Sequence, residues 1–253
     1  MMLEGKHALV TGGGSGIGAA IAFALAHAGA QVTICGRRKD DLEFTGERHP
    51  NIHVQPADVT DAASIAKLYR RAQKARGTFD IVVANAGIAE SAPAEKIDLD
   101  QWNKILAVNL TGAFFSVQPA LEAMRRKKWG RIIFIASTAG LKGYPYVAHY
   151  VAAKHGVVGL ARALATETIK DGITVNALCP GFTETSLLDR AVEHVARKSK
   201  KSEHEARSML LTSNPQGRFI QPQEVADAAV WLCQEGSGVI TGQAISVSGG
   251  ETW

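Results

Sequence analysis

The residues Thr11-Gly12-Gly13-Gly14-Ser15-Gly16-Ile17-Gly18 follow the apolar segment 7–10 and precede an alanine-rich segment with helical character. Glycines let the chain turn tightly, bring its backbone close to a ligand and pack the following helix on the strand. The start of that helix offers unpaired N–H groups and a positive dipole end to an anion. Between a strand and a helix, such a stretch predicts a turn that binds the pyrophosphate of a dinucleotide; a flexible turn without ligand is the alternative. The expected contact residues are Gly12, Ser15, Gly16, Ile17 and Gly18.

Apolar, β-branched segments alternate with helix-like segments along the rest of the chain. The expected strands are 7–10, 31–34, 51–54, 80–84, 131–136, 173–178 and 244–247. The expected helices are 17–29, 61–75, 100–127, 149–170, 185–211 and 222–234. This alternation predicts an α/β fold, a Rossmann-like, doubly wound parallel sheet of about seven strands with helices on both faces. The nearly continuous apolar strands fit burial on both sides.

Length and composition limit the possible classes of protein. The 253 residues fit one domain over 1–253, without disulfides. The three cysteines have no paired or metal-like spacing, so we expect a reduced, cytoplasmic protein with no metal site. We see no signal peptide and no apolar run long enough to span a membrane. The net charge of +4 suits anionic ligands but does not by itself indicate nucleic acid as a partner.

The spacing TGxxxGxG differs from the GxGxxG of most two-domain dehydrogenases and resembles that of the short-chain dehydrogenases/reductases. The resemblance extends from Lys6 to Gly250. It implies that Asp58 and Val59, at the end of the third strand, contact adenine. Asn85-Ala86-Gly87 resembles the NNAG motif of the family, with Ala84 in place of the first Asn. In the segment after the sixth strand, the resemblance assigns the nicotinamide carboxamide to Pro180, Gly181, Thr183 and Thr185, although relatives usually carry an apolar residue at 183.

The residues after the second strand bear on the choice of cofactor. An Asp or Glu there would bind the ribose 2′-hydroxyl of NAD and repel the 2′-phosphate of NADP. This chain has Gly36, followed by Arg37, whose guanidinium can fork onto a phosphate. The pattern favours NADP(H), with NAD(H) as the alternative if Arg37 and Arg38 only begin a solvated helix. Ser15 stands where NADP-using relatives often carry a basic residue, which weakens the NADP interpretation.

Four residues match the catalytic set of the family: Asn109, Ser137, Tyr150 and Lys154. Tyr150 and Lys154 are four apart, so on a helix they share one face. A tyrosine has a pKa of ~10, and a neighbouring ammonium favours the phenolate, so the pair can act as an acid and base. Ser137 can hydrogen-bond the substrate oxygen. By resemblance, Lys154 also bonds the nicotinamide ribose, and Asn109 holds a water that joins Lys154 to solvent.

The alternative for the tyrosine–lysine pair is a chance pair on a surface helix. His149 and His155 flank Tyr150 and Lys154. Helical geometry turns both histidines away from the tyrosine–lysine face, so we expect packing or polar roles for them. We expect Cys179 to be a buried small hydrophobe.

The region near 185–215 corresponds to the variable substrate lid of the family. It contains six cations that suit an anionic handle, such as coenzyme A phosphates or an acyl carrier protein; a solvated helix face is the alternative. These cations are Arg190, Arg197, Lys198, Lys200, Lys201 and Arg207. The segments YVAAKHGVVGLARALATE, CPG, NPQGRF and ITGQAISVSGG resemble 3-oxoacyl-thioester reductases, 3-hydroxybutyrate dehydrogenases and polyketide ketoreductases. Ser248 takes the place of Asp in the VDGG ending of the family.

The resemblance also implies a homotetramer built on helices 100–127 and 149–170 and the C-terminal strand, with Trp253 at an interface. Three functions remain open. The first is an NADP-linked reductase of 3-oxoacyl thioesters, and the second an NAD-linked dehydrogenase of a small hydroxy acid, cyclic alcohol or polyol. The third is an NADP sensor without turnover, against which the complete Ser137–Tyr150–Lys154 set argues. In every case we expect a small-molecule ligand, and neither nucleic acid nor membrane as a partner.

Overall fold

Seven parallel strands form one sheet in the order β3-β2-β1-β4-β5-β6-β7 in the computed structural model, which describes residues 2–252. The strands are β1 His7–Thr11, β2 Gln31–Cys35, β3 Ile52–Val54, β4 Ile81–Ala84, β5 Gly130–Ile135, β6 Ile173–Pro180 and β7 Ala244–Val247. The order reverses between β1 and β4, and ligands of open α/β sheets bind at such a switch point, outside the carboxyl ends of the strands. The predicted fold class is confirmed.

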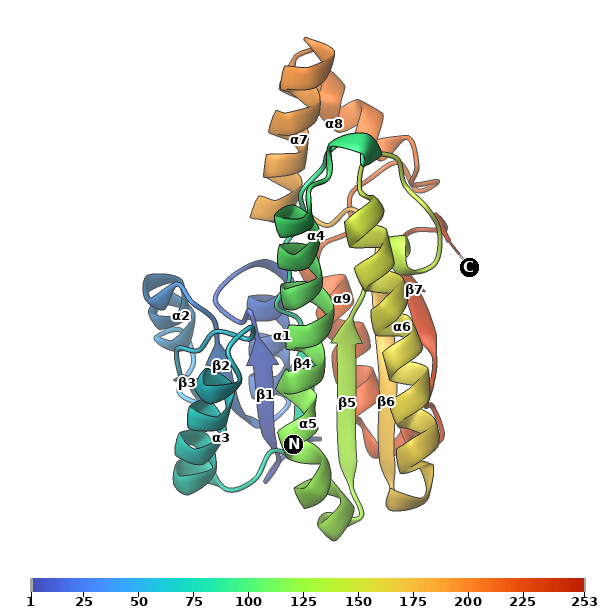
Figure 1. Cartoon of the computed structure of the whole chain (residues 1–253). Coiled ribbons are helices and arrows are strands. Elements are labelled where there is room, and N and C mark those ends of the chain that lie inside the picture. Colours follow the sequence, from blue (N-terminus) through green and yellow to red (C-terminus); the bar gives the residue numbers. More distant parts are fainter. Residues whose placement is uncertain (1, 253) are drawn as a thin grey trace.

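Helices cover both faces of the sheet (Figure 1). They are α1 Gly16–His27, α2 Lys39–Gly46, α3 Ala62–Arg76, α4 Leu99–Leu106, α5 Gly112–Lys127, α6 Ala148–Thr168, α7 Ser186–Ser199, α8 Glu203–Leu211 and α9 Pro222–Cys233. Two apolar cores result, one beneath α3, α5 and α6 and one beneath α1 and α9. Val82 enters the first core and Val83 the second, because successive side chains of a strand point to opposite faces.

Two long helices expected from the sequence are interrupted. The predicted helix 100–127 comprises α4, a π-helical turn at Ala107–Thr111, and α5. The predicted helix 185–211 is α7 and α8, because Lys200 adopts φ 56° and ends α7. The side chains of Ser202 and Glu205 then cap the start of α8 reciprocally.

Other details also differ from expectation. The short helix α2 was not among the expected helices. Asp58 and Val59 do not end the third strand: β3 stops at Val54, and both residues lie in the loop that follows. Trp253, expected at an interface, lies outside the described residues. No helix in the stretch 2–252 is long and apolar enough to cross a membrane.

Candidate active site

The glycine turn joins β1 to α1 at the carboxyl edge of the sheet. Gly12 has φ 66° and Gly16 φ 53°, conformations that glycine adopts without strain. A Cβ on Gly18 would lie 2.2 Å from the carbonyl oxygen of Gly12, so the helix approaches the turn too closely for a larger residue. Ser15 and Ile17 flank Gly16 at the start of α1, where no side chain caps the helix. The free N–H groups of this helix end suit a pyrophosphate.

The end of β4 holds the glycine turn in place. The amide of Asn85 donates from Nδ2 to the carbonyl oxygen of Thr11 at 2.9 Å and to that of Gly12 at 3.3 Å. The Thr11 hydroxyl in turn accepts hydrogen bonds from the backbone N–H groups of Asn85 and Ala86, each at 3.0 Å. Asn85 therefore shapes the turn through its side chain, whereas the substituted position, Ala84, is an ordinary buried strand residue.

Positive charge lines the β2 side of this edge. Arg38 donates to the Ser15 hydroxyl at 3.2 Å and forms an ion pair with Asp41 at 2.6 Å. Hydrogen bonds from the backbone and hydroxyl of Thr60 lower the pKa of Asp58, and the nearby charge of Arg37 acts in the same direction. Both arginines are exposed. The structure thus brings together Arg37, Arg38, Ser15 and Asp58 along one rim of the site. The hydrogen bond from Arg38 to Ser15 was not predicted from the sequence.

Ser137 and Tyr150 lie at the carboxyl end of β5 and the start of α6. The Ser137 hydroxyl accepts a hydrogen bond from the N–H of Ala139 at 3.1 Å, which fixes the turn after the strand. Desolvation raises the pKa of Tyr150, and hydrogen bonding with Ser137 acts in the opposite direction. The two hydroxyls therefore occupy one site, where a substrate oxygen would meet both.

Lys154 lies one helical turn beyond Tyr150 and is 4% exposed. Its ammonium donates to the carbonyl oxygen of Ile135 at 2.8 Å and lies 5.6 Å from the centroid of the Tyr150 ring. Burial lowers its pKa to about 8. Lys154 is therefore a buried cation close to the tyrosine, and most of it remains protonated at neutral pH.

Asn109 occupies the middle of the π-helical turn and is 1% exposed. Its Nδ2 donates to the carbonyl oxygens of Ile88 and Ile105 at 2.9 and 3.0 Å, and its Oδ1 accepts from the N–H of Ile88 at 3.1 Å. A Cβ on Gly87 would lie 2.8 Å from Oδ1 of Asn109 and 3.8 Å from Nζ of Lys154. The asparagine and the lysine thus flank Gly87, and the direct bonds of Asn109 are to the backbone.

The segment after β6 crosses toward the glycine turn. A Cβ on Gly16 would lie 3.0 Å from Cγ2 of Thr185, the residue that precedes the first turn of α7. The Thr185 hydroxyl donates to the carbonyl oxygen of Thr183 at 3.2 Å, and the Thr183 hydroxyl donates to that of Gly181 at 3.0 Å. Thr183 is buried and turned toward the backbone, whereas Thr185 faces the glycine turn. Pro180 ends β6, and Gly181 bonds to Val247 of β7.

Helices α7 and α8 stand above the carboxyl ends of the strands (Figure 1). They share a small apolar core centred on Leu188, Val192, Ala206 and Phe219. Arg207 of α8 pairs with Glu184 at 2.6 Å and with Asp189 of α7 at 3.5 Å, so one of the six cations of the region is engaged internally. The five others, exposed on α7 and the turn after it, are Arg190, Arg197, Lys198, Lys200 and Lys201.

Three further side chains, two histidines and a cysteine, lie close to the reacting residues in the sequence or in space. His149 is fully buried, neither ring nitrogen has a hydrogen-bond partner, and burial lowers its pKa; His155 is exposed. Cys179 is also buried, which raises the pKa of its thiol to about 11 and keeps it protonated.

Tyr144 and Glu251 form a hydrogen bond next to the residue that follows Ser137. The sequence did not predict this pair, because neither residue belongs to a motif whose spacing indicates its chemistry.

The groups along this edge of the sheet form a site of the shape and charge that a dinucleotide requires. The cradle at Gly12, Gly16 and Gly18 leaves no room for side chains, and the uncapped start of α1 faces it. Arg37, Asp58 and Thr185 lie around the same edge, and Lys154 is buried close by. This donor set fits an anionic pyrophosphate and a nicotinamide ribose.

Comparison with known proteins agrees with this geometry. The family model of the short chain dehydrogenases matches residues 6–196. The chain belongs to this family. It is 40% identical to D-beta-hydroxybutyrate dehydrogenase of Cupriavidus necator, over 98% of each chain. It is 37% identical to acetoacetyl-CoA reductase of Shinella zoogloeoides, over 96% of this chain and 97% of the relative.

A solved structure of a variant of actinorhodin polyketide ketoreductase with NADPH superposes with a TM-score of 0.94, at 36% identity over 97% of each chain. As a short-chain dehydrogenase, the protein is an NAD(P)-dependent oxidoreductase that acts on CH–OH groups. The predicted family and enzyme class are confirmed.

Proposed function

We propose that this enzyme is an NADP(H)-linked reductase of 3-oxoacyl thioesters, with Tyr150 as its proton donor. The observation that carries the proposal is the buried Lys154 ammonium close to the Tyr150 ring, with Ser137 beside the tyrosine hydroxyl. This arrangement supports proton transfer to a carbonyl oxygen held by both hydroxyls.

The chain contributes proton transfer and electrostatics to the reaction. The bound nicotinamide supplies or accepts the hydride. Ser137 donates to the substrate oxygen and stabilises the charge that develops there, while Tyr150 gives that oxygen its proton. Lys154 makes the tyrosine a stronger acid, since its positive charge stabilises the phenolate. Asn109 and Gly87 hold the backbone beside Lys154, and a water at this point would connect the ammonium to solvent.

The preference for NADP(H) rests on charge at the rim. Gly36 follows β2 where a carboxylate would select NAD, Arg37 comes next, and Arg38 donates to the Ser15 hydroxyl. The 2′-phosphate would lie among these groups, with Asp58 and Val59 beside the adenine. Gly12, Gly16, Ile17, Gly18, Asn85, Ala86 and Gly87 would form the pyrophosphate and ribose cradle, and Pro180, Gly181 and Thr185 the nicotinamide side. Thr183 would act through the backbone.

The substrate proposal rests on relatives and on the lid. Proteins similar over nearly the whole chain are named for acetoacetyl-CoA and 3-oxoacyl-[acyl-carrier-protein] reduction. We propose that one domain over 1–253 carries residues 185–215 as a substrate lid, and that its exposed cations attract coenzyme A phosphates. Replacing Lys198, Lys200 and Lys201 by Ala should raise KM for acetoacetyl-CoA at low salt, and leave KM for a thioester without phosphates unchanged.

A second candidate is an NAD-linked hydroxy acid dehydrogenase, and the 40% identity to D-beta-hydroxybutyrate dehydrogenase favours it. The two candidates differ in cofactor and in the group carried by C1. Loss of nicotinamide absorbance is therefore measured with NADPH or NADH, and with acetoacetyl-CoA or acetoacetate. Faster oxidation with NADPH and the thioester supports the reductase. Faster oxidation with NADH and the free acid supports the second candidate.

Tyr150→Phe tests the mechanism and separates catalysis from cofactor sensing. We expect turnover to fall by roughly 10²–10⁴-fold, the usual contribution of a general acid, while cofactor still binds. Tyr146→Phe is the matched control, because Tyr146 lies four residues earlier and is 66% exposed. Undiminished turnover in Tyr150→Phe would refute the proton-donor role.

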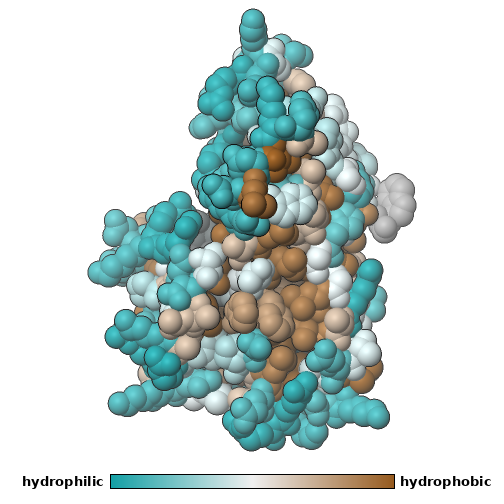
Figure 2. Space-filling model, viewed as in Figure 1, coloured by the Kyte–Doolittle hydropathy of each residue, from teal (hydrophilic) through white to brown (hydrophobic). Residues whose placement is uncertain are grey.

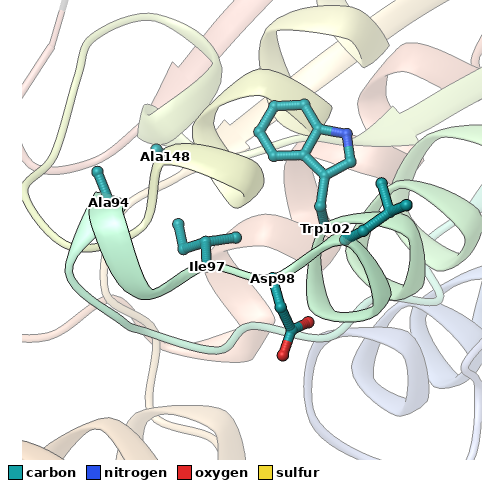
Figure 3. Close-up of a pocket in the computed structure, with 6 residues that line it drawn as sticks. Ala94, Ile97, Asp98, Trp102 and Ala148 are labelled. Carbon is teal, nitrogen blue, oxygen red and sulfur yellow. The ribbon is translucent and has the colours of Figure 1, made fainter.

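We also propose that the enzyme is a homotetramer. We propose a cytoplasmic location because the three cysteines have no paired spacing. A broad apolar surface covers α4, α5 and α6 in Figure 2. The turn before α5, α5 itself and α6 carry the partly buried apolar residues Leu110, Phe114, Phe115 and Leu160. Figure 3 shows an apolar pocket beside this region, where Ile97 and Trp102 lie near Ala148. Such a surface suits a second copy of the chain. Light scattering after size exclusion measures the mass, and a monomer would contradict the proposal.

A further inference from the structure

The C-terminal tail folds back over the carboxyl end of the sheet. After β7, Gly249 and Gly250 have φ 63° and 89°, values that a residue with a side chain adopts only under strain. A Cβ on Gly249 would lie 2.4 Å from Oδ1 of Asn214, so the tail passes directly beneath the end of the lid. The two glycines bring the side chain of Glu251 inward, where it is 1% exposed.

Ser248 stabilises this turn. Its hydroxyl accepts a hydrogen bond from the N–H of Thr252 at 3.2 Å and lies 2.7 Å from the hydroxyl of Ser246. The Ser246 hydroxyl in turn lies 2.7 Å from that of Thr252. The serine that replaces the usual Asp of the family ending therefore closes the tail into the conformation that carries Glu251.

Glu251 meets the loop that follows Ser137. The Tyr144 hydroxyl bonds to Oε1 of Glu251 and lies 2.7 Å from the hydroxyl of Thr138. Because tyrosine has one proton and a carboxylate is the stronger acceptor, Tyr144 donates to Glu251 and Thr138 donates to Tyr144. Lys142 lies 3.3 Å from the same carboxylate oxygen. A chain of hydrogen bonds thus runs from the tail to the neighbour of Ser137.

The same carboxylate also reaches the nicotinamide side of the site. A Cβ on Gly181 would lie 3.0 Å from Oε2 of Glu251. Tyr144 is close enough to Tyr150 for the two hydroxyls to interact electrostatically, and burial together with Glu251 raises the pKa of Tyr144. Glu251 therefore touches both the segment between β5 and α6, which joins Ser137 to Tyr150, and the segment after β6.

We propose that Glu251 is a positioning residue for the reaction. Its buried carboxylate holds Tyr144 against Thr138 and so fixes the loop between Ser137 and Tyr150 relative to the nicotinamide side of the site. A charged acceptor in this place also keeps Tyr144 protonated and its ring in one orientation along the wall of the substrate site. The expected effect of Glu251 on kcat rests on the proposed function. Its expected effect on the order of the segment after Ser137 does not.

The kinetics of four variants test whether the contact between Glu251 and Tyr144 supports turnover. Glu251→Ala and Tyr144→Phe should each lower kcat about tenfold, since small misplacements of reacting groups reduce rates strongly. Glu251→Gln keeps an acceptor for Tyr144 and should stay within about threefold of the parent by the same argument. The double variant Tyr144→Phe/Glu251→Ala should be no slower than the slower single variant, because both act through one contact. Additive losses, or a kcat unchanged in Glu251→Ala, would overturn the proposal.

The matched control is Asp171→Asn. It also removes an ion-paired carboxylate, one bonded to Lys128 at 2.8 Å and Arg125 at 3.2 Å, but it lies just before β6, at the opposite end of the sheet. Its kcat should equal that of the parent. A comparable loss in Asp171→Asn would mean that any lost ion pair lowers kcat, and the positioning role would fail.

Amide hydrogen exchange provides a readout without turnover. The N–H groups of Leu141 and Lys142 donate to the carbonyl oxygen of Thr138 at 2.9 and 3.0 Å. In Glu251→Ala their exchange should accelerate, while exchange in β5 should not change. Unchanged exchange at these two amides would refute the role of Glu251, even in a preparation that oxidises no cofactor. Absence of turnover in the parent protein would instead count against the proposed function alone.

Discussion

The ammonium of Lys154 donates a hydrogen bond of 2.8 Å to the carbonyl oxygen of Ile135, the last residue of β5. This bond ties α6 to the strand end two residues before Ser137. It also places a buried cation whose pKa is lowered to about 8 by desolvation. The lysine therefore changes charge within an accessible pH range.

The pH dependence of catalysis should report this lysine. We expect kcat/KM for NADPH, which reflects the free enzyme, to fall above about pH 8 as Lys154 loses its proton. Lys154→Arg should be slower but should lack this alkaline decline up to pH 10, since a guanidinium stays protonated. Steady-state rates between pH 6 and 10 provide the test. An identical decline in Lys154→Arg would assign it to another group.

Cofactor selectivity should depend on Arg37. Removing its charge in Arg37→Ala should raise KM for NADPH about tenfold, equivalent to about 1.4 kcal/mol, and change KM for NADH little. Lys39→Ala is the control, because Lys39 is an exposed cation of α2 that pairs with Glu43 at 3.0 Å. Initial rates with both cofactors give the ratio. Equal losses for NADH and NADPH in Arg37→Ala would contradict the assignment.

The glycine turn should not tolerate a methyl group at Gly18. In Gly18→Ala the new Cβ would lie 2.2 Å from the carbonyl oxygen of Gly12 and 2.4 Å from Nδ2 of Asn85. We expect a loss of roughly 1–3 kcal/mol in the free energy of unfolding and weaker cofactor binding. Gly236→Ala, where no heavy atom lies within 4 Å, should be neutral or slightly stabilising. Urea unfolding and cofactor titration of both variants decide the matter, and equal stability would contradict the packing argument.

His7 should make the fold sensitive to acid. Its Nδ1–H donates to the carbonyl oxygen of Gly77 and its Nε2 accepts from the Thr33 hydroxyl, each at 2.9 Å, so the ring is held neutral. Burial lowers its pKa from 6.5 to about 4. The unfolded chain therefore binds a proton that the folded chain does not, and stability falls as pH drops from about 6.5 toward 4.

By pH 5 this loss should reach about 2 kcal/mol from His7 alone. His7→Asn should be less stable at pH 7.5 but should lose less on acidification. Urea unfolding at pH 7.5 and 5.0 measures both. A loss between the two pH values as large as that of the parent would show that other groups cause the sensitivity.

Most of the fold could be predicted because its signals are local. Each strand is a short β-branched run, and the structure reproduces all seven with shifts of at most two residues at their ends. Helix boundaries were harder to predict. Helix α2 is charged and short, with Phe44 64% exposed, so it has little apolar periodicity. The break between α7 and α8 at Lys200 has one signal in the sequence, the Ser202–Glu205 capping pattern. The π-helical turn at Ala107–Thr111 has no such signal.

For the site, the residues with motifs came together and those without motifs were missed. Tyr150, Lys154 and Ser137 meet because helix periodicity and a strand end bring them to one place. Tyr144 and Glu251 are more than a hundred residues apart, and only the tertiary fold joins them. Arg38 was seen as a possible helix start; its bond to Ser15 depends on how β2 lies beside the glycine turn.

The turn at Ala107–Thr111 also constrains how this region could be redesigned. It contains one residue more than the α-helical turn it replaces, so the helix beyond it is rotated by about 100° relative to an unbroken α-helix. That phase shift allows Asn109 to face Ile88 while Val117 and Met124 still enter the core beneath α5. A helix exchanged with a regular one of equal span would satisfy one of these orientations and lose the other. The extra residue must therefore be transplanted together with the asparagine.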